Sequence, residues 1–255
     1  MEQTPRGGRR VAFFGGSFDP PHQGHLAVAR AARAALKLDT VLFAPVGAQP
    51  LKPLGSTASF DDRVEMTRLA VEGMQGFEVS LADAPKPSAA PNYTLETLLQ
   101  LRAGLSGGAL FCLMGADSFF GLKRWHRSAE IPFAAALIVA SRPGQPLDDL
   151  RAALPHGLTM ESAAGPNPVL DPITDKAVEV HTFLLRNGAG DTAPFFLLPG
   201  LHVEISASQI RDLIRDGVHS AAGAEATKGT ESPLAGQSLL PVPVLDYIRA
   251  HGLYR

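Results

Sequence analysis

The stretch Gly15–His25, with the sequence GGSFDPPHQGH, constrains the fold of this chain more than any other part of it. A short apolar run, Val11–Phe14, comes directly before it, and an amphipathic run, Leu26–Leu36, comes directly after it. An apolar run, two glycines, two prolines and an amphipathic run predict a strand, a tight turn and the start of a helix. The stretch is therefore expected to place a helix N-terminus directly beyond the end of a strand.

The residue types in this turn suit a negatively charged ligand. Gly15 and Gly16 allow the backbone to come close to a ligand, and the first N–H groups of a helix, with its dipole, favour phosphate. His22 and His25 are one helical turn apart, so both imidazoles can face one anion. The spacing differs from His-Glu-x-x-His and the chain has no cysteine pair, which disfavours zinc. Together these features predict a cradle for a triphosphate.

Predicted strands and helices alternate along the rest of the chain, which favours a parallel sheet with helices on both faces. We expect strands over residues 10–14, 40–45, 77–81, 109–114, 134–141, 178–185 and 195–198, and helices over residues 24–37, 61–74, 94–102, 206–215 and 242–250. Residues 145–177 are expected to form an irregular excursion, and the glycine-rich stretch 218–239 a flexible insertion. The predicted fold class is an α/β, Rossmann-like doubly wound parallel sheet, built as a single domain over residues 1–255.

Length and composition limit the class of protein. The chain has 255 residues, of which 45% are hydrophobic, so one domain with a sizeable core is expected. A net charge of −2 gives no broad basic field for DNA or RNA. The longest apolar stretch, Ile131–Ala140, is too short to cross a bilayer, and the start of the chain lacks the apolar region of a signal peptide. The one cysteine, Cys112, is interpreted as a buried structural thiol. We therefore expect a cytoplasmic protein without nucleic-acid or membrane partners.

Two further segments carry groups suited to a nucleotide. Ile205–Arg211 reads ISASQIR, in which Ser206 caps a helix with Gln209 as its capping-box partner. Taken alone, this segment is either an ordinary capped helix with a solvated arginine or a second anion site made of hydroxyls, N–H groups and a guanidinium. Gly115–Ser118 follows a buried strand, where ligands of such sheets bind. Its aspartate can cap the next helix or accept hydrogen bonds from ribose hydroxyls.

The sequence GGSFDPPHQGH resembles the signature Gly-Gly-(Ser/Thr)-Phe-Asp-Pro-x-His-x-Gly-His of the HxGH nucleotidyltransferases. ISASQIR is similar to the second signature of that family, whose helix start grips the β- and γ-phosphates. The resemblance implies transfer of a nucleotidyl group from a nucleoside triphosphate to a phosphate. It also implies that His22 and His25 are catalytic and stabilise the transferring phosphoryl group, and that Ser206, Ser208 and Arg211 hold the distal phosphates.

Three more segments indicate a branch of this family. NYT at residues 92–94, GADS at residues 115–118 and the pair Trp125-His126 resemble segments of the bacterial nicotinate mononucleotide adenylyltransferases, as does the final GLYR. That branch often has Pro-Pro-His-Lys where this chain has QPLK at residues 49–52, and Asn92 replaces its usual serine. The resemblance implies transfer of AMP from ATP to nicotinate mononucleotide, which yields deamido-NAD and pyrophosphate in NAD biosynthesis.

The resemblance also assigns residues to the two substrates. The residues expected to contact ATP are Gly15, Gly16, Ser17, Phe18, His22, His25, Gly115, Asp117, Ser206, Ser208 and Arg211. The residues expected to contact nicotinate mononucleotide are Tyr93, Thr94, Trp125, His126 and Lys52. In this assignment Trp125 stacks on the pyridine, Thr94 and backbone N–H groups read its carboxylate, and Arg142 is a further phosphate contact. Mg²⁺ is the expected cofactor, held mainly by the ATP phosphates, with no metal site built from protein residues.

The same segments are also compatible with other acceptors and with a function other than catalysis. The acceptor can instead be nicotinamide mononucleotide or phosphopantetheine, although phosphopantetheine enzymes are typically shorter and lack the Tyr-Thr and Asp-Ser…Trp segments. A cytidylyltransferase would carry an Arg-Thr-x-Gly-Ile-Ser run, which this chain lacks, and no P-loop motif occurs. A non-catalytic sensor of adenine nucleotides would keep the pocket, but binding alone scarcely needs both histidines.

Overall fold

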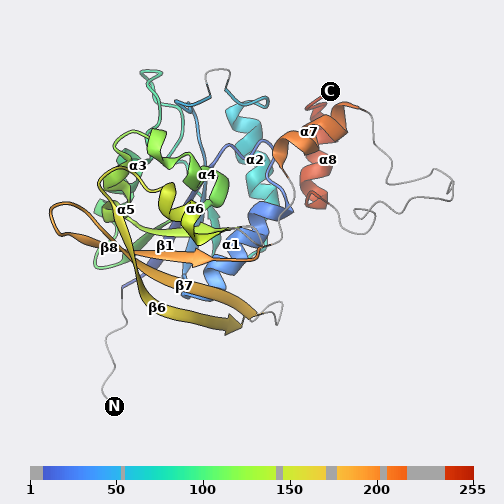
Figure 1. Ribbon diagram of the computed structural model, residues 1–255. Coiled ribbons are helices and arrows are strands. Elements are labelled where there is room, and N and C mark those ends of the chain that lie inside the picture. Colours follow the sequence, from blue (N-terminus) through green and yellow to red (C-terminus); the bar gives the residue numbers. More distant parts are fainter. Residues whose placement is uncertain (1–7, 53–54, 142–145, 171–176, 202–205, 217–238) are drawn as a thin grey trace, which may run out of the picture.

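The computed structural model describes residues 8–52, 55–141, 146–170, 177–201, 206–216 and 239–255. These residues form one twisted sheet with the strand order β3-β2-β1-β4-β5-β8-β7-β6 (Figure 1). The strands are β1 (Arg10–Gly16), β2 (Thr40–Pro45), β3 (Phe77–Val79), β4 (Ala109–Gly115), β5 (Ala136–Ala140), β6 (Thr159–Leu170), β7 (Ala177–Arg186) and β8 (Thr192–Leu198).

Helices cover both faces of this sheet (Figure 1). The α-helices are α1 (Gln23–Leu36), α2 (Phe60–Val71), α3 (Thr94–Gly104), α4 (Ala116–Phe120), α5 (Ile131–Ala134), α6 (Leu147–Ala152), α7 (Ala207–Arg215) and α8 (Val242–His251). Two short 3-10 helices are η1 (Leu122–Arg124) and η2 (Ser128–Glu130). Buried side chains of α1, α2, α7 and α8 form one hydrophobic core with the sheet, and those of α3, α4, α5 and α6 form the other.

The alternation of side chains along each strand explains why there are two cores. In β1, Ala12 and Phe14 belong to the core under α1, whereas Val11 and Phe13 belong to the core under α3. Successive side chains of a strand point to opposite faces of the sheet, so a strand that is covered on both sides must be apolar throughout. The continuous apolar runs of β1, β4 and β5 follow from this requirement.

Strand directions place the ligand-binding edge. β3, β2, β1, β4, β5 and β8 pair in parallel, and their carboxyl ends meet at one edge of the sheet. From β1 the chain adds β2 and then β3 on one side, whereas β4 and β5 lie on the other. The order therefore reverses between β1 and β4, and the crevice at such a reversal is where parallel sheets bind ligands.

Most of the predicted elements are confirmed. The strand over residues 40–45 has the predicted bounds, and most of the other boundaries of confirmed elements differ by one to three residues. Ser59 caps α2 by accepting from the N–H of Asp62 at 3.1 Å, and Gly252 follows α8 in the left-handed conformation. The helix predicted to reach residue 74 ends at Val71, because Gly73 and Gly76 take the positive φ angles of a turn.

The prediction of an irregular excursion over residues 145–177 is wrong. This segment contains α6 and the strand β6, which pairs with β7 over most of its length. Two register shifts between residues 162 and 167 break the alternation that would have revealed the strand. The predicted parallel α/β sheet is confirmed for β3, β2, β1, β4, β5 and β8, whereas at this end β7 runs antiparallel to both β8 and β6. As the last strand of the sheet, β6 tolerates prolines that an inner strand would not.

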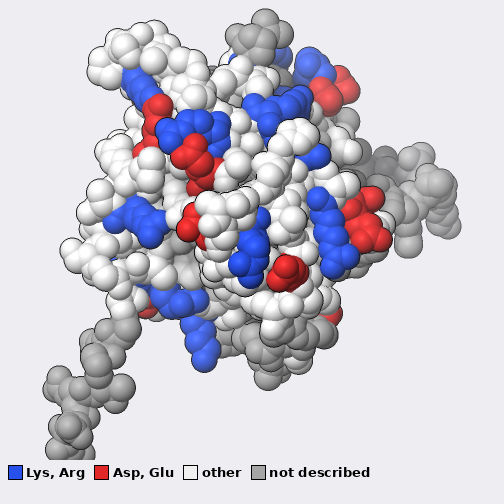
Figure 2. Space-filling view, turned by 60° about the vertical axis from the view of Figure 1, so that its left-hand side comes forward, with Lys and Arg blue, Asp and Glu red and all other residues white. Residues whose placement is uncertain are grey.

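Some predictions fall on residues outside the described ranges. These are the phosphate contact of Arg142 and nearly all of the insertion over residues 218–239. Within the described ranges, no helix is long and apolar enough to cross a membrane. Acidic and basic side chains are interspersed over the face that Figure 2 shows, in line with the small net charge.

The close contact between two loops beside the crevice predicts the effect of one substitution. An alanine Cβ at Gly47 would lie 2.4 Å from the backbone nitrogen of Pro85, so the two loops must move apart. We expect Gly47→Ala to lower the free energy of unfolding by about 1–3 kcal/mol, as overpacking does. Gly104→Ala is the control, because its Cβ would meet nothing within 4 Å at the end of α3. Urea unfolding of both variants checks this, and equal stabilities would contradict it.

Candidate active site

A cleft of about 930 Å³ opens at the carboxyl ends of β1 and β4. It is lined by every residue that the sequence predicts for the site and that the structure describes: Gly15, Gly16, Ser17, Phe18, His22, His25, Lys52, Tyr93, Thr94, Gly115, Asp117, Trp125, His126, Ser206, Ser208 and Arg211. These residues come from segments far apart in the sequence, so the fold gathers them at one place.

The turn after β1 is built around the ring of Phe18. This side chain is 1% exposed, and its ring packs edge-on against Phe14 and His25, with centroids 5.6 and 5.0 Å away. A Cβ at Gly16 would lie 3.1 Å from the same ring, which explains a glycine there. Because the Phe18 ring turns into the core, the backbone of Gly15–Ser17 is left to line the cleft.

Asp19 ties three other segments to this turn. Its carboxylate is buried and accepts from the backbone N–H groups of Thr57 and Ala58, at 2.7 and 3.1 Å. The hydroxyl of Tyr254 donates to the same carboxylate at 2.8 Å. Arg211 donates to the Asp19 carbonyl at 2.7 Å, and its guanidinium lies 3.9 Å from the carboxylate. A buried charge requires such partners, and here they come from a loop, from α7 and from the segment after α8.

Arg63 holds the ends of β1 and β2 together from below the cleft. This α2 side chain is 2% exposed and donates to the carbonyls of Ser17 and Val46, at 2.7 and 2.9 Å. Burial lowers the pKa of Arg63, and the negative charge of Asp19 opposes that shift. A buried guanidinium so close to the turn adds fixed positive potential beneath it.

His22 and His25 lie side by side at the start of α1. His22 is the N-cap residue and is 5% exposed, whereas His25 is half-buried. Their ring centroids are 3.8 Å apart, and Nδ1 of His25 accepts from the backbone N–H of His22 at 3.2 Å. A neutral imidazole that accepts at Nδ1 carries its proton on Nε2. Nδ1 of His22 is buried without a hydrogen-bond partner among the described residues.

Both histidines are held neutral in the cleft. Burial lowers the pKa of His22 from 6.5 to about 4. Burial also lowers the pKa of His25, and the nearby His22 lowers it further. The pair therefore offers N–H donors rather than full charges at neutral pH in the absence of an anion.

One N–H group of the α1 N-terminus is engaged within the protein. The N–H of Gln23 donates to the carbonyl of Leu239 at 3.0 Å. The sequence predicts the first N–H groups of this helix as part of the phosphate cradle, and Gln23 is not available for that role. Gly24 and His25, the next residues, line the cleft.

Lys52 lines the cleft in a chain of polar contacts. Its ammonium group donates to the Ser17 hydroxyl at 2.9 Å, and that hydroxyl donates to Gln49 at 3.3 Å. Desolvation lowers the pKa of Lys52, Asp19 opposes this effect, and Arg211 and Arg63 add to it. Lys52 is thus held against the turn that carries the two glycines.

The start of α7 forms another wall of the cleft. The predicted capping box is present, with the Ser206 hydroxyl accepting from the Gln209 N–H at 3.1 Å and the Gln209 side chain accepting from the Ser206 N–H at 3.0 Å. Arg211 donates to the Ser208 hydroxyl at 3.1 Å as well as to Asp19. The guanidinium therefore links α7 to the β1 turn and is not a solvated side chain.

Aromatic rings gather at the end of the cleft near α3. Tyr93 and His126 lie with ring centroids 4.4 Å apart. Trp125 is half-buried and packs against the core under α3 while lining the cleft, whereas its sequence context predicts an exposed ring. Asn92 is buried and joins two loops, accepting from the Ala48 N–H and donating to the Ala84 carbonyl, both at 2.9 Å. Its amide thus has a structural role that a serine could not copy.

Three residues of the site are missing from the sequence predictions. Asp19, Arg63 and Asp83 are buried. Asp83 lines the cleft and accepts from the Thr97 hydroxyl at 2.5 Å. Burial raises the pKa of Asp83. Asp19 lies inside the GGSFDPPHQGH stretch, so its position was a usable signal. Arg63 follows a predicted helix cap like any surface arginine, and no local pattern distinguishes it.

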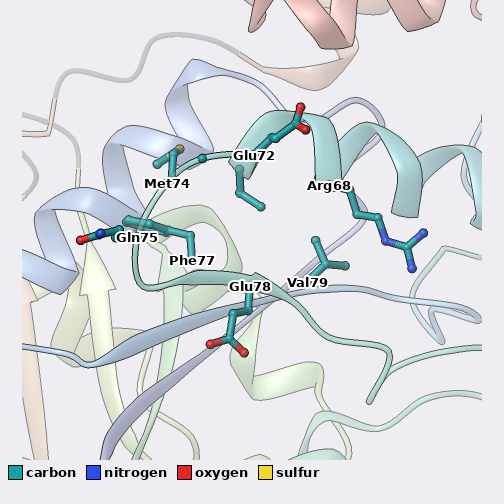
Figure 3. Close-up of a pocket in the computed structure, with 9 residues that line it drawn as sticks. Arg68, Glu72, Met74, Gln75, Phe77, Glu78 and Val79 are labelled. Atoms are coloured by element: carbon teal, nitrogen blue, oxygen red, sulfur yellow. The ribbon is translucent and has the colours of Figure 1, made fainter.

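In the part of the chain that the structure describes, neither a metal site nor the second pocket of the protein competes with this cleft as the place of the chemistry. Within the described ranges, no three His, Cys, Asp or Glu side chains come together in a way that could hold a metal ion. A second pocket of about 630 Å³ lies between the end of α2 and the edge strand β3, and Figure 3 shows Glu72 and Glu78 on opposite sides of it. It is lined by Arg68, Val71, Glu72, Gly73, Met74, Gln75, Phe77, Glu78 and Val79. Its lining has neither the paired histidines nor a helix start, so the chemistry belongs to the larger cleft.

Comparison with known proteins gives one family. A family model described as Cytidylyltransferase-like matches residues 13–213. A relative from Gloeobacter violaceus named "Probable nicotinate-nucleotide adenylyltransferase" is 34% identical over 247 residues, which cover 97% of each chain. A relative from Dechloromonas aromatica with the same name is 35% identical over 246 residues, covering 96% of this chain and 97% of its own.

A solved structure shares the fold. The Plasmodium falciparum nicotinic acid mononucleotide adenylyltransferase, complexed with NaAD, matches with a TM-score of 0.61 over 96% of this chain and 97% of its own. At 14% sequence identity this likeness concerns the fold. It agrees with the predicted α/β class.

The burial of His22 predicts how stability depends on pH. The pKa of His22 is about 4 in the folded chain and 6.5 when exposed, so the unfolded chain binds more protons below pH 6.5. The free energy of unfolding is therefore not reduced by His22 above pH 6.5. It falls as the pH drops from 6.5 toward 4, and the loss at pH 5 is roughly 2 kcal/mol. We expect His22→Asn to lose less stability between pH 7 and pH 5 than the unchanged protein. Urea unfolding at both pH values measures this.

The exposed His156 provides the control for this prediction. His156→Asn should keep the pH dependence of the unchanged protein. A His22→Asn variant with that same dependence would show that His22 is not held neutral by burial.

Proposed function

The chain belongs to the cytidylyltransferase-like family and, by its identity to the relatives over nearly its whole length, to the nicotinate-nucleotide adenylyltransferases, and from this we propose its reaction. The cleft transfers AMP from ATP to nicotinate mononucleotide. The products are deamido-NAD and pyrophosphate. One observation carries the proposal for this chain. Two helix starts, those of α1 and α7, meet the glycine turn of β1 in a single cleft, and both carry groups suited to phosphate.

The reaction needs no covalent intermediate with the protein. A phosphate oxygen of nicotinate mononucleotide forms a bond to the α-phosphorus of ATP, and the bond between the α-phosphorus and the bridging oxygen to the β-phosphate breaks. The electron pair of that bond leaves with pyrophosphate. The second pKa of a phosphate monoester is about 6, so the nucleophile is already ionised at neutral pH and no general base is required. Catalysis therefore consists of positioning two polyanions and stabilising the charge that develops between them.

His22 and His25 supply donors for that charge. With Nδ1 of His25 occupied by a backbone N–H, its Nε2–H is the group left for the transferring phosphoryl. Neutral imidazoles do not need a counterion while the cleft is empty. When the triphosphate binds, its negative charge opposes the effect of burial on the pKa of each histidine.

Fixed positive charge comes from residues beside the turn. Lys52, Arg63 and Arg211 all face the loop between β1 and α1, and Asp19 neutralises only part of their charge. We assign Lys52 to a substrate phosphate, and Ser206, Ser208 and Arg211 to the distal phosphates of ATP. Arg63 acts from below through the carbonyls it holds.

The acceptor is assigned to the aromatic end of the cleft. Trp125 offers a face for the pyridine ring, and Tyr93 with His126 forms a second aromatic surface nearby. Thr94 is the first residue of α3, whose N-terminal N–H groups suit the nicotinate carboxylate. Asp117, exposed in the first turn of α4, is assigned to the ATP ribose with Gly115.

Mg²⁺ fits this site as a companion of ATP. The described residues offer no acidic cluster for the ion, whereas the phosphates of ATP provide the oxygen ligands it prefers. The bound ion would neutralise part of the charge on the triphosphate. The protein residues assigned to those phosphates are His22, His25, Ser206, Ser208 and Arg211, which all line the cleft.

Pyrophosphate release from ATP and Mg²⁺ tests the proposed function. Nicotinate mononucleotide, nicotinamide mononucleotide and phosphopantetheine are compared as acceptors under the same conditions. We expect a large preference in kcat/KM for the nicotinate form. Equal rates with the first two acceptors would contradict the assigned carboxylate pocket at Thr94, and tight ATP binding without release from any acceptor would indicate a sensor.

Replacement of the histidines separates chemistry from folding. We expect His22→Ala and His25→Ala to lower kcat by about 10²–10⁴, the range seen when a preorganised donor to a transition state is lost. The fold should persist, as judged by circular dichroism and thermal unfolding. His181→Ala is the control, because this histidine lies on β7 beside Glu179, outside the cleft. Near-normal turnover in either variant of the pair would refute the mechanism.

A further inference from the structure

The segment after α8 reaches the loop that carries His22. Tyr254 lies 235 residues after Asp19 in the sequence, yet its hydroxyl donates to the Asp19 carboxylate at 2.8 Å. A second contact comes from the residues before α8, because the Leu239 carbonyl accepts from the N–H of Gln23 at 3.0 Å. The C-terminal segment, residues 239–255, therefore contacts both ends of the short loop between Asp19 and Gln23, which contains His22.

The conformation of Tyr254 shows that this position is determined by its surroundings. The residue is 8% exposed and has a φ of 64°, in the left-handed region that residues other than glycine rarely adopt. Such a conformation is energetically unfavourable and persists where neighbouring contacts compensate for it. The turn after α8, in which Leu253 N–H donates to the Ile248 carbonyl at 3.0 Å, directs the ring inward to Asp19.

Among the described residues, the Tyr254 hydroxyl donates to Asp19 and, at 4.0 Å, to the sulfur of Met66, and of these two residues Asp19 alone lines the cleft. Tyr254 is not among the residues that line the cleft, whereas Asp19, His22 and Arg211 are. The Asp19 carbonyl accepts from Arg211, and its carboxylate accepts from the loop at Thr57 and Ala58. Because one residue carries all of these bonds, a shift of its carboxylate changes the positions of the groups assigned to ATP.

We propose that Tyr254 is a positioning residue for the nucleoside triphosphate half of the cleft, acting through its hydrogen bond to Asp19. The phenol holds the Asp19 carboxylate, which in turn sets the loop of His22 and the guanidinium of Arg211. The acceptor half is formed by Tyr93, Thr94 and Trp125, which make no hydrogen bond or ring contact with this network within the part of the chain that the structure describes, so it does not depend on the network. This inference rests on the proposed function for the identity of the two substrates.

The chain offers a matched control in the same segment. Tyr247 lies on α8, and its hydroxyl donates to the Asp62 carboxylate at 3.0 Å. Asp62 is on the surface at the start of α2 and takes no part in the cleft. Tyr247→Phe therefore removes a tyrosine–carboxylate hydrogen bond of nearly the same length as that of Tyr254, but one whose acceptor does not line the cleft.

The experiment compares Tyr254→Phe with Tyr247→Phe. Binding of α,β-methylene-ATP, in which the bond to be broken is replaced, is measured by titration calorimetry, and KM for each substrate is measured by pyrophosphate release. We expect Tyr254→Phe to weaken binding of the analogue and to raise KM for ATP about tenfold, since a hydrogen bond to a charged group is lost. KM for nicotinate mononucleotide should stay unchanged. Tyr247→Phe should leave all three values as in the unchanged protein.

The outcomes separate a positioning role from a merely structural one. Equal values for the two variants, or a parallel rise of both KM values in Tyr254→Phe, would overturn the proposal. An Asp19→Asn background gives a second test, because Tyr254→Phe should have little further effect once the charged acceptor is gone. If the two changes simply add, Tyr254 does not act through Asp19. The analogue-binding measurement needs no turnover, so it stands even if the unchanged protein releases no pyrophosphate, which would refute the proposed function alone.

Discussion

Asp19 carries a carboxylate that is 4% exposed, and a buried charge is stable only where donors surround it. Here the loop before α2 and the segment after α8 supply donors to the carboxylate itself. Arg211 of α7 donates to the carbonyl of Asp19 and places its guanidinium 3.9 Å from the carboxylate. The sheet alone would leave these segments as separate loops at the carboxyl ends of its strands. The need to satisfy one carboxylate draws them into a common wall, and the cleft acquires its shape as a result.

Electrostatics in the cleft follow from which charges are buried. The histidines are neutral because burial disfavours their charged forms, whereas the arginines stay charged and are held by carbonyls. Potential for a polyanion therefore comes from groups that cannot lose their charge, and the histidines serve as donors beside them. This division explains how a chain with a net charge of −2 can bind a triphosphate locally.

Local sequence patterns revealed the elements and the motif residues, because strands covered on both faces are apolar and helix caps have fixed chemistry. The strand over residues 40–45 and the capping box at Ser206 are examples. What the patterns missed depends on contacts made at a distance. β6 pairs with β7 through a shifted register. Arg63 is buried because the carbonyls of two loops accept its hydrogen bonds. Trp125 is half-buried against a hydrophobic core, which its polar neighbours in the sequence do not indicate. None of these features has a signal within a few residues of itself.

The two outer strands of the sheet have a consequence for how copies of this protein behave together. β3 has three residues, and β6 is interrupted by two register shifts and contains Pro168. An edge strand that is short, irregular or lacks an N–H group is a poor template for the strand of another chain. The sheet therefore ends on both sides in a way that resists intermolecular β-pairing and aggregation, although its inner strands are almost entirely apolar.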